Sequence, residues 1–319
     1  PAGARRSGAT GGGGRMIVEV LRPGLCDLVM DGGRPGWGRF GVPAGGAADR
    51  DALAAANRLV GNPPAAPGLE IVGRGPQLHF PRGGVIALTG APFRSARAAG
   101  LAAGWNQTLV LAAEEILRLG EPEAGYRCWL AVRGGLAVVP VLDSASTLPQ
   151  AGWGGHYGRP LRTGDVLHTG RTGGGVHLLR AHPPALPHAA PLRVVAGPQS
   201  AAFTDAGLAA FVGGTFRVDP ASDRRGIRLT GPRVASRNAD WPTQGVLPGA
   251  IQVPPDGQPI VLGWDGPVTG GYPVIATVID ADLPRLAQVR PGTALRFETV
   301  SVEGARAAQP VAWELAEWG

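Results

Sequence analysis

Residues 31–49 form the densest cluster of chemically useful side chains in the 319-residue chain, with Asp31, Arg34 and Asp49 set among glycines. Glycine lets backbone amides approach a ligand closely, and a guanidinium makes a two-point contact with a carboxylate or phosphate. A helix is expected directly after this segment, and a helix N-terminus favours an anion. The segment is therefore a candidate anion-binding loop. The alternative is an ordinary turn closed by an internal Arg–Asp pair.

Two later segments carry similar chemistry. Residues 221–231 contain Arg224 and Arg228, and in the expected strand Arg228 shares a face with Gly226. The alternative for this segment is a solvated strand edge guarded by charge. Residues 249–273 surround a Pro-Asp-Gly turn, and a plain hairpin with its loop is the alternative there. The polar side chains of this otherwise apolar segment include Gln252, Asp265, Thr269 and Tyr272.

All thirty basic residues are arginine, so the chain contains no lysine. It can therefore form no lysine Schiff base, has no Walker A lysine for a phosphate and carries no covalently attached biotin. The arginines are scattered without a basic stripe, and the net charge is only +6, which argues against nucleic-acid binding. The two cysteines and six histidines show no metal-ligand spacing, so no metal is expected.

Short Val/Ile/Leu runs bounded by Gly, Pro or Asp dominate the sequence, which contains 52 glycines and 31 prolines. This pattern of short apolar runs separated by turn residues is typical of β-barrels or β-sandwiches, so a mainly β fold with few short helices is expected. Strands are expected at residues 17–21, 85–89, 108–112, 128–132, 175–179, 192–196, 226–230, 259–263, 274–279 and 294–300. Helical signals occur at 49–61, capped by Asp49, at 204–212, capped by Thr204, and in a turn at 282–288.

Composition also divides the chain. Residues 1–15 contain no apolar run and are expected to form a flexible tail, with Met16 as a plausible start. The Pro-rich residues 181–193 are a candidate linker between a first domain, residues 16–190, and a second domain, residues 191–319. No apolar stretch approaches ~18 residues and no secretory signal is recognisable, so a cytoplasmic protein without a membrane span is expected.

Long stretches of the sequence resemble one family. They are residues 20–62 and 69–80, residues 128–165, and in the C-terminal part RVVAGPQ, SDRRGIRL, PGAIQVPPDGQPIVL and TGGYPVIATV. Together they resemble the family that comprises allophanate hydrolase subunit 2, the C subunit of 5-oxoprolinase and biotin-dependent carboxyltransferases. The resemblance extends over about residues 16–303. It implies two cyclophilin-like β-barrel domains.

The resemblance also implies partners and a choice of activities. The partners would be the family's subunit 1 protein, which is like the B subunit of 5-oxoprolinase, and an ATPase-like A subunit. The first activity is that of a 5-oxoprolinase, in which ATP, shared with the partner subunits, drives opening of 5-oxo-L-proline to L-glutamate. The second is carboxyl transfer to urea from a biotin carried by another chain. The third is a regulatory protein that antagonises a kinase inhibitor.

The three polar segments coincide with motifs of this family, so we expect them to line one cleft for a small amide substrate. In that cleft Asp31, Asp49 and Asp265 are the candidate catalytic carboxylates, since a carboxylate can steer or deprotonate water. The candidate substrate- and anion-binding residues are Arg34, Arg224, Arg228, Gln252, Thr269 and Tyr272.

Overall fold

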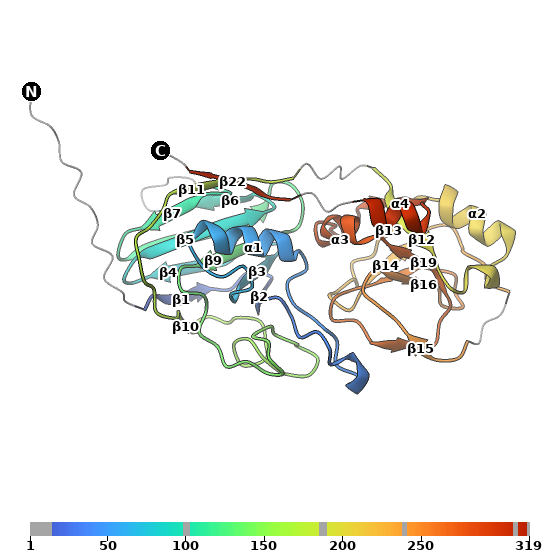
Figure 1. Cartoon of the computed structure of the whole chain (residues 1–319), viewed down its shortest axis with the longest axis horizontal. Helices are drawn as coiled ribbons and strands as arrows, with labels where there is room; N and C mark the ends of the chain where they lie inside the picture. Colours follow the sequence, from blue (N-terminus) through green and yellow to red (C-terminus); the bar gives the residue numbers. More distant parts are fainter. Residues whose placement is uncertain (1–14, 98–102, 185–189, 238–240, 309–311, 318–319) are drawn as a thin grey trace, which may run out of the picture.

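The computed structural model describes residues 15–97, 103–184, 190–237, 241–308 and 312–317. Strands dominate and helices are few and short, so the expected mainly β fold class is confirmed (Figure 1). The expected flexible tail lies outside the described residues except for Arg15. None of the helices in the described part of the chain is long and apolar enough to cross a membrane.

The first half of the structure, residues 15–182, contains two five-stranded sheets. One has the order β10-β1-β4-β8-β6 and the other the order β2-β3-β9-β5-β7. Their strands are β1 (Ile17–Arg22), β2 (Cys26–Met30), β3 (Gly68–Val72), β4 (Gln77–Phe80), β5 (Gly84–Gly90), β6 (Phe93–Ala96), β7 (Thr108–Leu111), β8 (Glu115–Pro122), β9 (Arg127–Val132) and β10 (Val166–His168). Apolar side chains from both sheets form one shared core.

Strand β9 lies between two packed layers, the core shared by the two sheets on one face and helix α1 (Arg50–Leu59) on the other. All six of its residues are buried, because it lies in the middle of its sheet with both faces covered. Alternation sends Cys128, Leu130 and Val132 into the core between the sheets, while Trp129 and Ala131 face away from it. Helix α1 packs over β5 and β9 on that second face.

Helix α1 follows its sequence signals closely. The Asp49 side chain accepts a hydrogen bond from the Ala52 amide at 2.9 Å, so the expected N-cap is confirmed. The helix ends before Gly61, which has a φ of +75°. Its buried residues are Ala52, Leu53, Ala55, Ala56, Asn57 and Leu59.

The second half, residues 190–308, is built on one eight-stranded sheet of order β20-β13-β14-β17-β16-β19-β12-β21. Its strands are β12 (Leu192–Ala196), β13 (Phe216–Val218), β14 (Gly226–Thr230), β16 (Ala250–Gln252), β17 (Ile260–Leu262), β19 (Val274–Val278), β20 (Ala294–Leu295) and β21 (Phe297–Thr299). The two edge strands β20 and β21 are separated only by Arg296, so the sheet curls until its edges nearly meet. The result is a barrel-like layer.

Smaller elements complete this half. Strands β15 (Gln244–Gly245) and β18 (Thr269–Gly270) pair with each other beside the barrel. The short helices are α2 (Asp205–Gly213), α3 (Leu283–Ala287), α4 (Val302–Ala307) and the 3-10 turns η3 (Ser200–Ala202) and η4 (Asp280–Asp282). The Thr204 side chain caps α2 by accepting from the Gly207 amide, as expected.

The two halves lie side by side and share a buried seam (Figure 1). Leu53 and Trp129 of the first half belong to the same core cluster as Ile251, Val261 and Trp264 of the second. In addition, strand β22 (Glu314–Glu317), near the C-terminus, returns to the first half and pairs antiparallel with β11 (Leu179–His182). The expected division near residue 190 stays a prediction.

Some expected strands differ from the structure. The strand expected at residues 175–179 is wrong over 175–178, because that glycine-rich stretch is irregular and exposed and β11 begins only at Leu179. The strand expected at 294–300 is split into β20 and β21. Strands β2 and β8 were not anticipated from residue patterns, although the turn residues Pro23-Gly24 and Asp31-Gly32 bound β2.

Candidate functional site

A cleft of about 570 Å³ opens where the two halves meet. The first half contributes residues 41–43 of the glycine-rich loop and the loop that contains Leu148 and Trp153. The second half contributes the start of β14 and the strands and loops between Gln252 and Tyr272. The polar lining residues are Gln150, Asp223, Arg225, Arg228, Gln252, Asp265 and Tyr272. Parts of all three segments identified in the sequence therefore reach this cleft.

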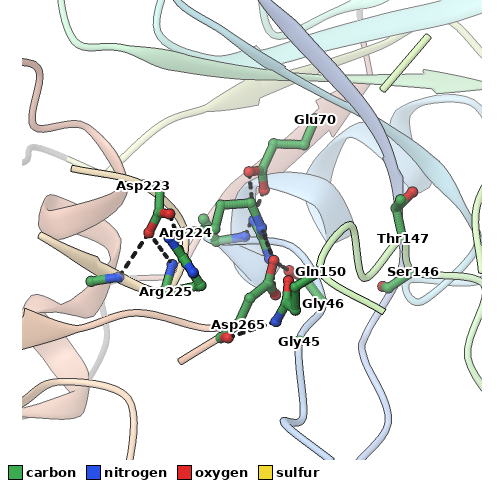
Figure 2. A network of polar contacts seen from close by, with 12 residues as sticks. Gly45, Gly46, Glu70, Ser146, Thr147, Gln150, Asp223, Arg224, Arg225 and Asp265 are labelled. Carbon is green, nitrogen blue, oxygen red and sulfur yellow. Dashed lines mark hydrogen bonds and ion pairs between the residues drawn. The ribbon is translucent and has the colours of Figure 1, made fainter. Parts of the chain in front are cut away.

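Arg224 lies at the seam beneath the cleft and joins the two halves (Figure 2). Its Nε and Nη2 atoms donate to the two carboxylate oxygens of Asp265 at 2.7 and 2.9 Å. Its Nη1 atom donates to Glu70 Oε1 at 2.6 Å, and Nη2 also donates to the Gly46 carbonyl at 2.6 Å. Because Glu70 and Gly46 belong to the first half, this single buried side chain fixes Asp265 relative to both halves.

Glu70 is the fully buried counter-charge of Arg224. It projects from β3, where it accepts hydrogen bonds from the Ala48 amide at 2.7 Å and from Trp129 Nε1 at 3.3 Å. Arg127 Nε lies 3.5 Å from the same carboxylate. Burial alone would raise the pKa of Glu70, but the charges of Arg224 and Arg127 lower it below its ordinary value. The same attraction raises the pKa of Arg224 despite its burial.

Asp265 lines the floor of the cleft but is almost fully buried. Both of its carboxylate oxygens accept from Arg224, and its backbone carbonyl accepts from Gln150 Nε2 at 2.9 Å (Figure 2). The Gly45 amide donates to the neighbouring Trp264 carbonyl at 3.1 Å. These bonds hold the floor rigidly, so Asp265 can present a fixed acceptor to a ligand.

Two arginines give the cleft its positive side. Arg225 forms an exposed ion pair with Asp223, whose carboxylate also accepts from the Arg225 and Gly226 amides. Arg228 lies two residues beyond Gly226 on β14, so strand alternation brings it to the same face, and both line the cleft. Among the described residues, the Arg228 guanidinium has no ion-pair partner within 4.0 Å. It is thus free to meet an anionic ligand.

The neighbouring part of the lining is neutral. Gln252, at the end of β16, is buried and donates from Nε2 to the Tyr272 carbonyl at 3.3 Å. The Tyr272 side chain is 43% exposed at the cleft surface. Trp153 closes one side and also lines a wider surface depression around His156 and Tyr157. The lining thus combines two amides, a phenol and apolar groups, which suits a small polar ligand.

Asp31 and Arg34 lie outside the cleft lining. The Asp31 carboxylate accepts from the Gly33 amide at 2.7 Å and from the Ser144 hydroxyl, the Ala145 amide and the Ser146 hydroxyl at 2.6 Å each. The Arg34 guanidinium is buried and donates to the backbone carbonyls of Val141 and Ser146. Desolvation lowers the pKa of Arg34. Both side chains therefore hold a buried turn, as the alternative for this loop expected, but each bonds to other partners and no ion pair joins Arg34 to Asp31.

The other predicted site residues lie in three different places. Asp49 caps α1 and lines a second, smaller cavity. Thr269 is exposed on the short strand β18. Of the nine predicted residues, Arg228, Gln252, Asp265 and Tyr272 line the cleft, and Arg224 supports it from below.

Sequence reasoning missed several residues of the site. Glu70 carried a usable signal, because a carboxylate inside the apolar run of β3 requires a buried partner. Arg225 adjoins a predicted residue, but only the geometry of the chain shows which of the two arginines faces the cleft. Gln150 and Trp153 lie in an irregular loop whose sequence has no periodicity to reveal its inward side.

Comparison with known proteins adds a consistent set of relatives. The carboxyltransferase domain, subdomain A and B, matches residues 40–299. The C subunit of the Escherichia coli 5-oxoprolinase is 38% identical over 298 residues, which cover 91% of this chain and 93% of that protein. The C subunit of the Haemophilus influenzae 5-oxoprolinase is 35% identical over 295 residues, 91% of this chain and 93% of that protein.

A solved structure has a similar fold. The crystal structure of the Kluyveromyces lactis urea amidolyase superposes with a TM-score of 0.84 at 30% sequence identity. The match covers 91% of this chain but only 19% of that much longer chain. The architecture described above is therefore shared with one segment of a larger enzyme.

Proposed function

The chain belongs to the family of the carboxyltransferase domain, subdomain A and B, and from this premise we propose that it is the C-subunit type of component of an ATP-dependent 5-oxoprolinase. The observation that carries the proposal is a match that covers 91% of this chain and 93% of each of two proteins named as the C subunit of 5-oxoprolinase. By contrast, the chain matches only a segment of the urea amidolyases.

The proposed reaction opens 5-oxo-L-proline to L-glutamate. A lactam carbonyl is a poor electrophile, and transfer of a phosphoryl group from ATP to its oxygen makes that oxygen a leaving group. Water then adds to the carbon, and the C–N bond breaks with protonation of the nitrogen, which leaves an acyl phosphate. A second water hydrolyses this acyl phosphate to the carboxylate and phosphate. A site for this chemistry needs cations for the developing charge and an acceptor that steers water.

The cleft offers groups of both kinds. Arg228 and Arg225 are placed to bind the substrate carboxylate or a phosphoryl group. The Gln252 and Gln150 amides suit hydrogen bonds to a lactam, and Asp265 supplies the fixed acceptor for water. The cleft volume of about 570 Å³ lies in the range of small-molecule sites. Since the chain has no lysine, contacts to ATP come from arginine, backbone amides or partner subunits.

The proposal includes an assembly. The relatives are named as components of a larger enzyme, and we propose a protein like the B subunit of 5-oxoprolinase and an ATPase-like A subunit as partners, all in the cytoplasm. Co-expression followed by size-exclusion chromatography tests the assembly. Incubation of the purified complex with 5-oxo-L-proline and ATP should release glutamate, whereas the chain alone should release none. Full turnover by the isolated chain would contradict the assembly.

The second candidate is carboxyl transfer from biotin carried on another chain. The family name and the likeness to urea amidolyase favour it. The same complex should then be tested with urea and carboxybiotin. Urea-dependent loss of carboxybiotin, without glutamate formation from 5-oxo-L-proline, would replace the first proposal by the second.

A further inference from the structure

A second cavity, of about 170 Å³, lies apart from the cleft residues. Asp49 and the turns at residues 90–92 and 124–125 form its first-half side. Gln288 of the second half and Trp313, just before β22, close it, together with Pro183 and Pro184. At ~30 Å³ per water molecule, the cavity has room for a ligand the size of roughly five waters.

Asp49 is the charged group of this cavity. Its side chain is 5% exposed, and one oxygen accepts from the Ala52 amide. Of the other buried carboxylates, Glu70, Asp265 and Asp282 each pair with an arginine, whereas Asp27 and Asp31 form no such pair among the described residues. Among the described residues, no cation lies within 4.0 Å of the Asp49 carboxylate. Burial raises the pKa of Asp49 to about 6, and the charges of Asp51 and Glu70 add to the rise.

The remaining walls suit the flat or apolar side of an organic cation. Trp313 offers an indole ring, and ring faces attract cations. The prolines contribute apolar surface without amide donors. Gln288 is held in place, because its Oε1 accepts from the Tyr126 and Arg127 amides and its Nε2 donates to the Arg127 carbonyl.

We propose that this cavity binds a small organic cation, an ammonium or guanidinium group, opposite the Asp49 carboxylate and against Trp313. A buried carboxylate without a counter-charge gains most from such a partner. An anion would be repelled by Asp49. A divalent metal would need several carboxylate, histidine or thiol ligands, and no group of three such residues exists among the described residues. The inference is independent of the reaction proposed for the cleft.

Titration calorimetry of the full chain with isopropylammonium tests the proposal, with propan-2-ol as the neutral probe of the same shape. The wild-type protein should bind isopropylammonium at least tenfold more tightly than propan-2-ol. Asp49→Asn should weaken binding of the cation at least tenfold, while asparagine keeps the helix cap. Asp51→Asn, in the exposed part of the same first turn, is the matched control and should bind as the wild type does.

Trp313→Leu gives a second, independent variant and should weaken binding at least threefold through loss of the ring face. Unchanged affinity in Asp49→Asn would overturn the proposal, because it would place the cation elsewhere, for example at Asp223 in the cleft. Equal binding of propan-2-ol would also overturn it, since the cavity would then recognise shape alone. If Asp49→Asn does not fold, unchanged affinity in Trp313→Leu still decides against the site.

Discussion

Replacement of Arg224 by methionine tests whether the seam depends on one buried guanidinium. Methionine keeps much of the side-chain volume but removes the two bonds to Asp265, the bond to Glu70 and the bond to the Gly46 carbonyl. Glu70 would keep only the distant Arg127 contact at 3.5 Å, together with its neutral donors. Removal of one partner from a buried ion pair typically costs about 3–5 kcal/mol, because a buried charge is left uncompensated.

Urea denaturation should therefore show a loss of about 3–5 kcal/mol in the free energy of unfolding of Arg224→Met. Arg225→Met is the matched control, since the neighbouring ion pair with Asp223 is exposed and should contribute less than about 0.5 kcal/mol. Combining Arg224→Met with Asp265→Asn should recover at least about 1 kcal/mol, because among the described residues Asp265 pairs with Arg224 alone, whereas Glu70 keeps Arg127.

The pH dependence gives a further check. In the wild type the lowered pKa of Glu70 contributes stability that is present above the unfolded pKa of about 4.3 and is lost as the pH falls through the folded value. Without Arg224 this contribution shrinks, so the deficit of Arg224→Met should be full at neutral pH and should decrease only below about pH 4, where the wild type also loses the contribution. A deficit below about 1 kcal/mol, or a double variant no more stable than the single one, would refute the reasoning.

Three other variants separate structural from ligand-binding roles. Asp31→Asn should lower the free energy of unfolding by about 2–4 kcal/mol in a thermal melt, since an amide cannot accept all four hydrogen bonds. An unaltered melting curve with lost turnover would instead favour a chemical role for Asp31. Burial raises the pKa of Asp27 to about 7, so its contribution to stability is present below pH ~4 and is lost as the pH rises through about 7. Asp27→Asn should therefore be more stable than the wild type at pH 8 and should lose that advantage at pH 4. Arg228→Ala should raise the KM of the assembled enzyme for its anionic substrate at least ~10-fold and leave the melting curve nearly unchanged, and an unaltered KM would remove Arg228 from the site.

Capping residues and turn residues in the sequence predicted the helices and strands whose ends are set by neighbouring residues. Helix α1 is an example, because the Asp49 cap, the alanine-rich interior and Gly61 specify its start and end within a few residues. Strands β12 and β14 agree with their expected bounds for the same reason, since turn residues flank short apolar runs. Closure of the second sheet was not predictable from such patterns, because it depends on pairing of β12 with β21 from distant parts of the chain.

The candidate site shows the same limit. The sequence indicated which segments approach one another, and parts of all three reach the cleft. It could not indicate which side chain of a segment faces the ligand. Arg224 and Arg225 are neighbours of identical type, and only Glu70, far away in the sequence, draws Arg224 into the seam and leaves Arg225 at the surface. Likewise the serines that surround Asp31 come from a loop more than a hundred residues away.

The return of β22 to the first half has a consequence for synthesis on the ribosome. Leu315 and Trp313 cover the cluster formed by Ala56, Leu59 and Val60 at the C-terminal end of helix α1, yet they are translated after the whole second barrel. At roughly 5–20 residues per second, several seconds pass between emergence of β11 and of its partner. During that interval the nascent first half presents an unpaired strand edge and an uncovered apolar face, which makes it the stage at which a chaperone would be most useful.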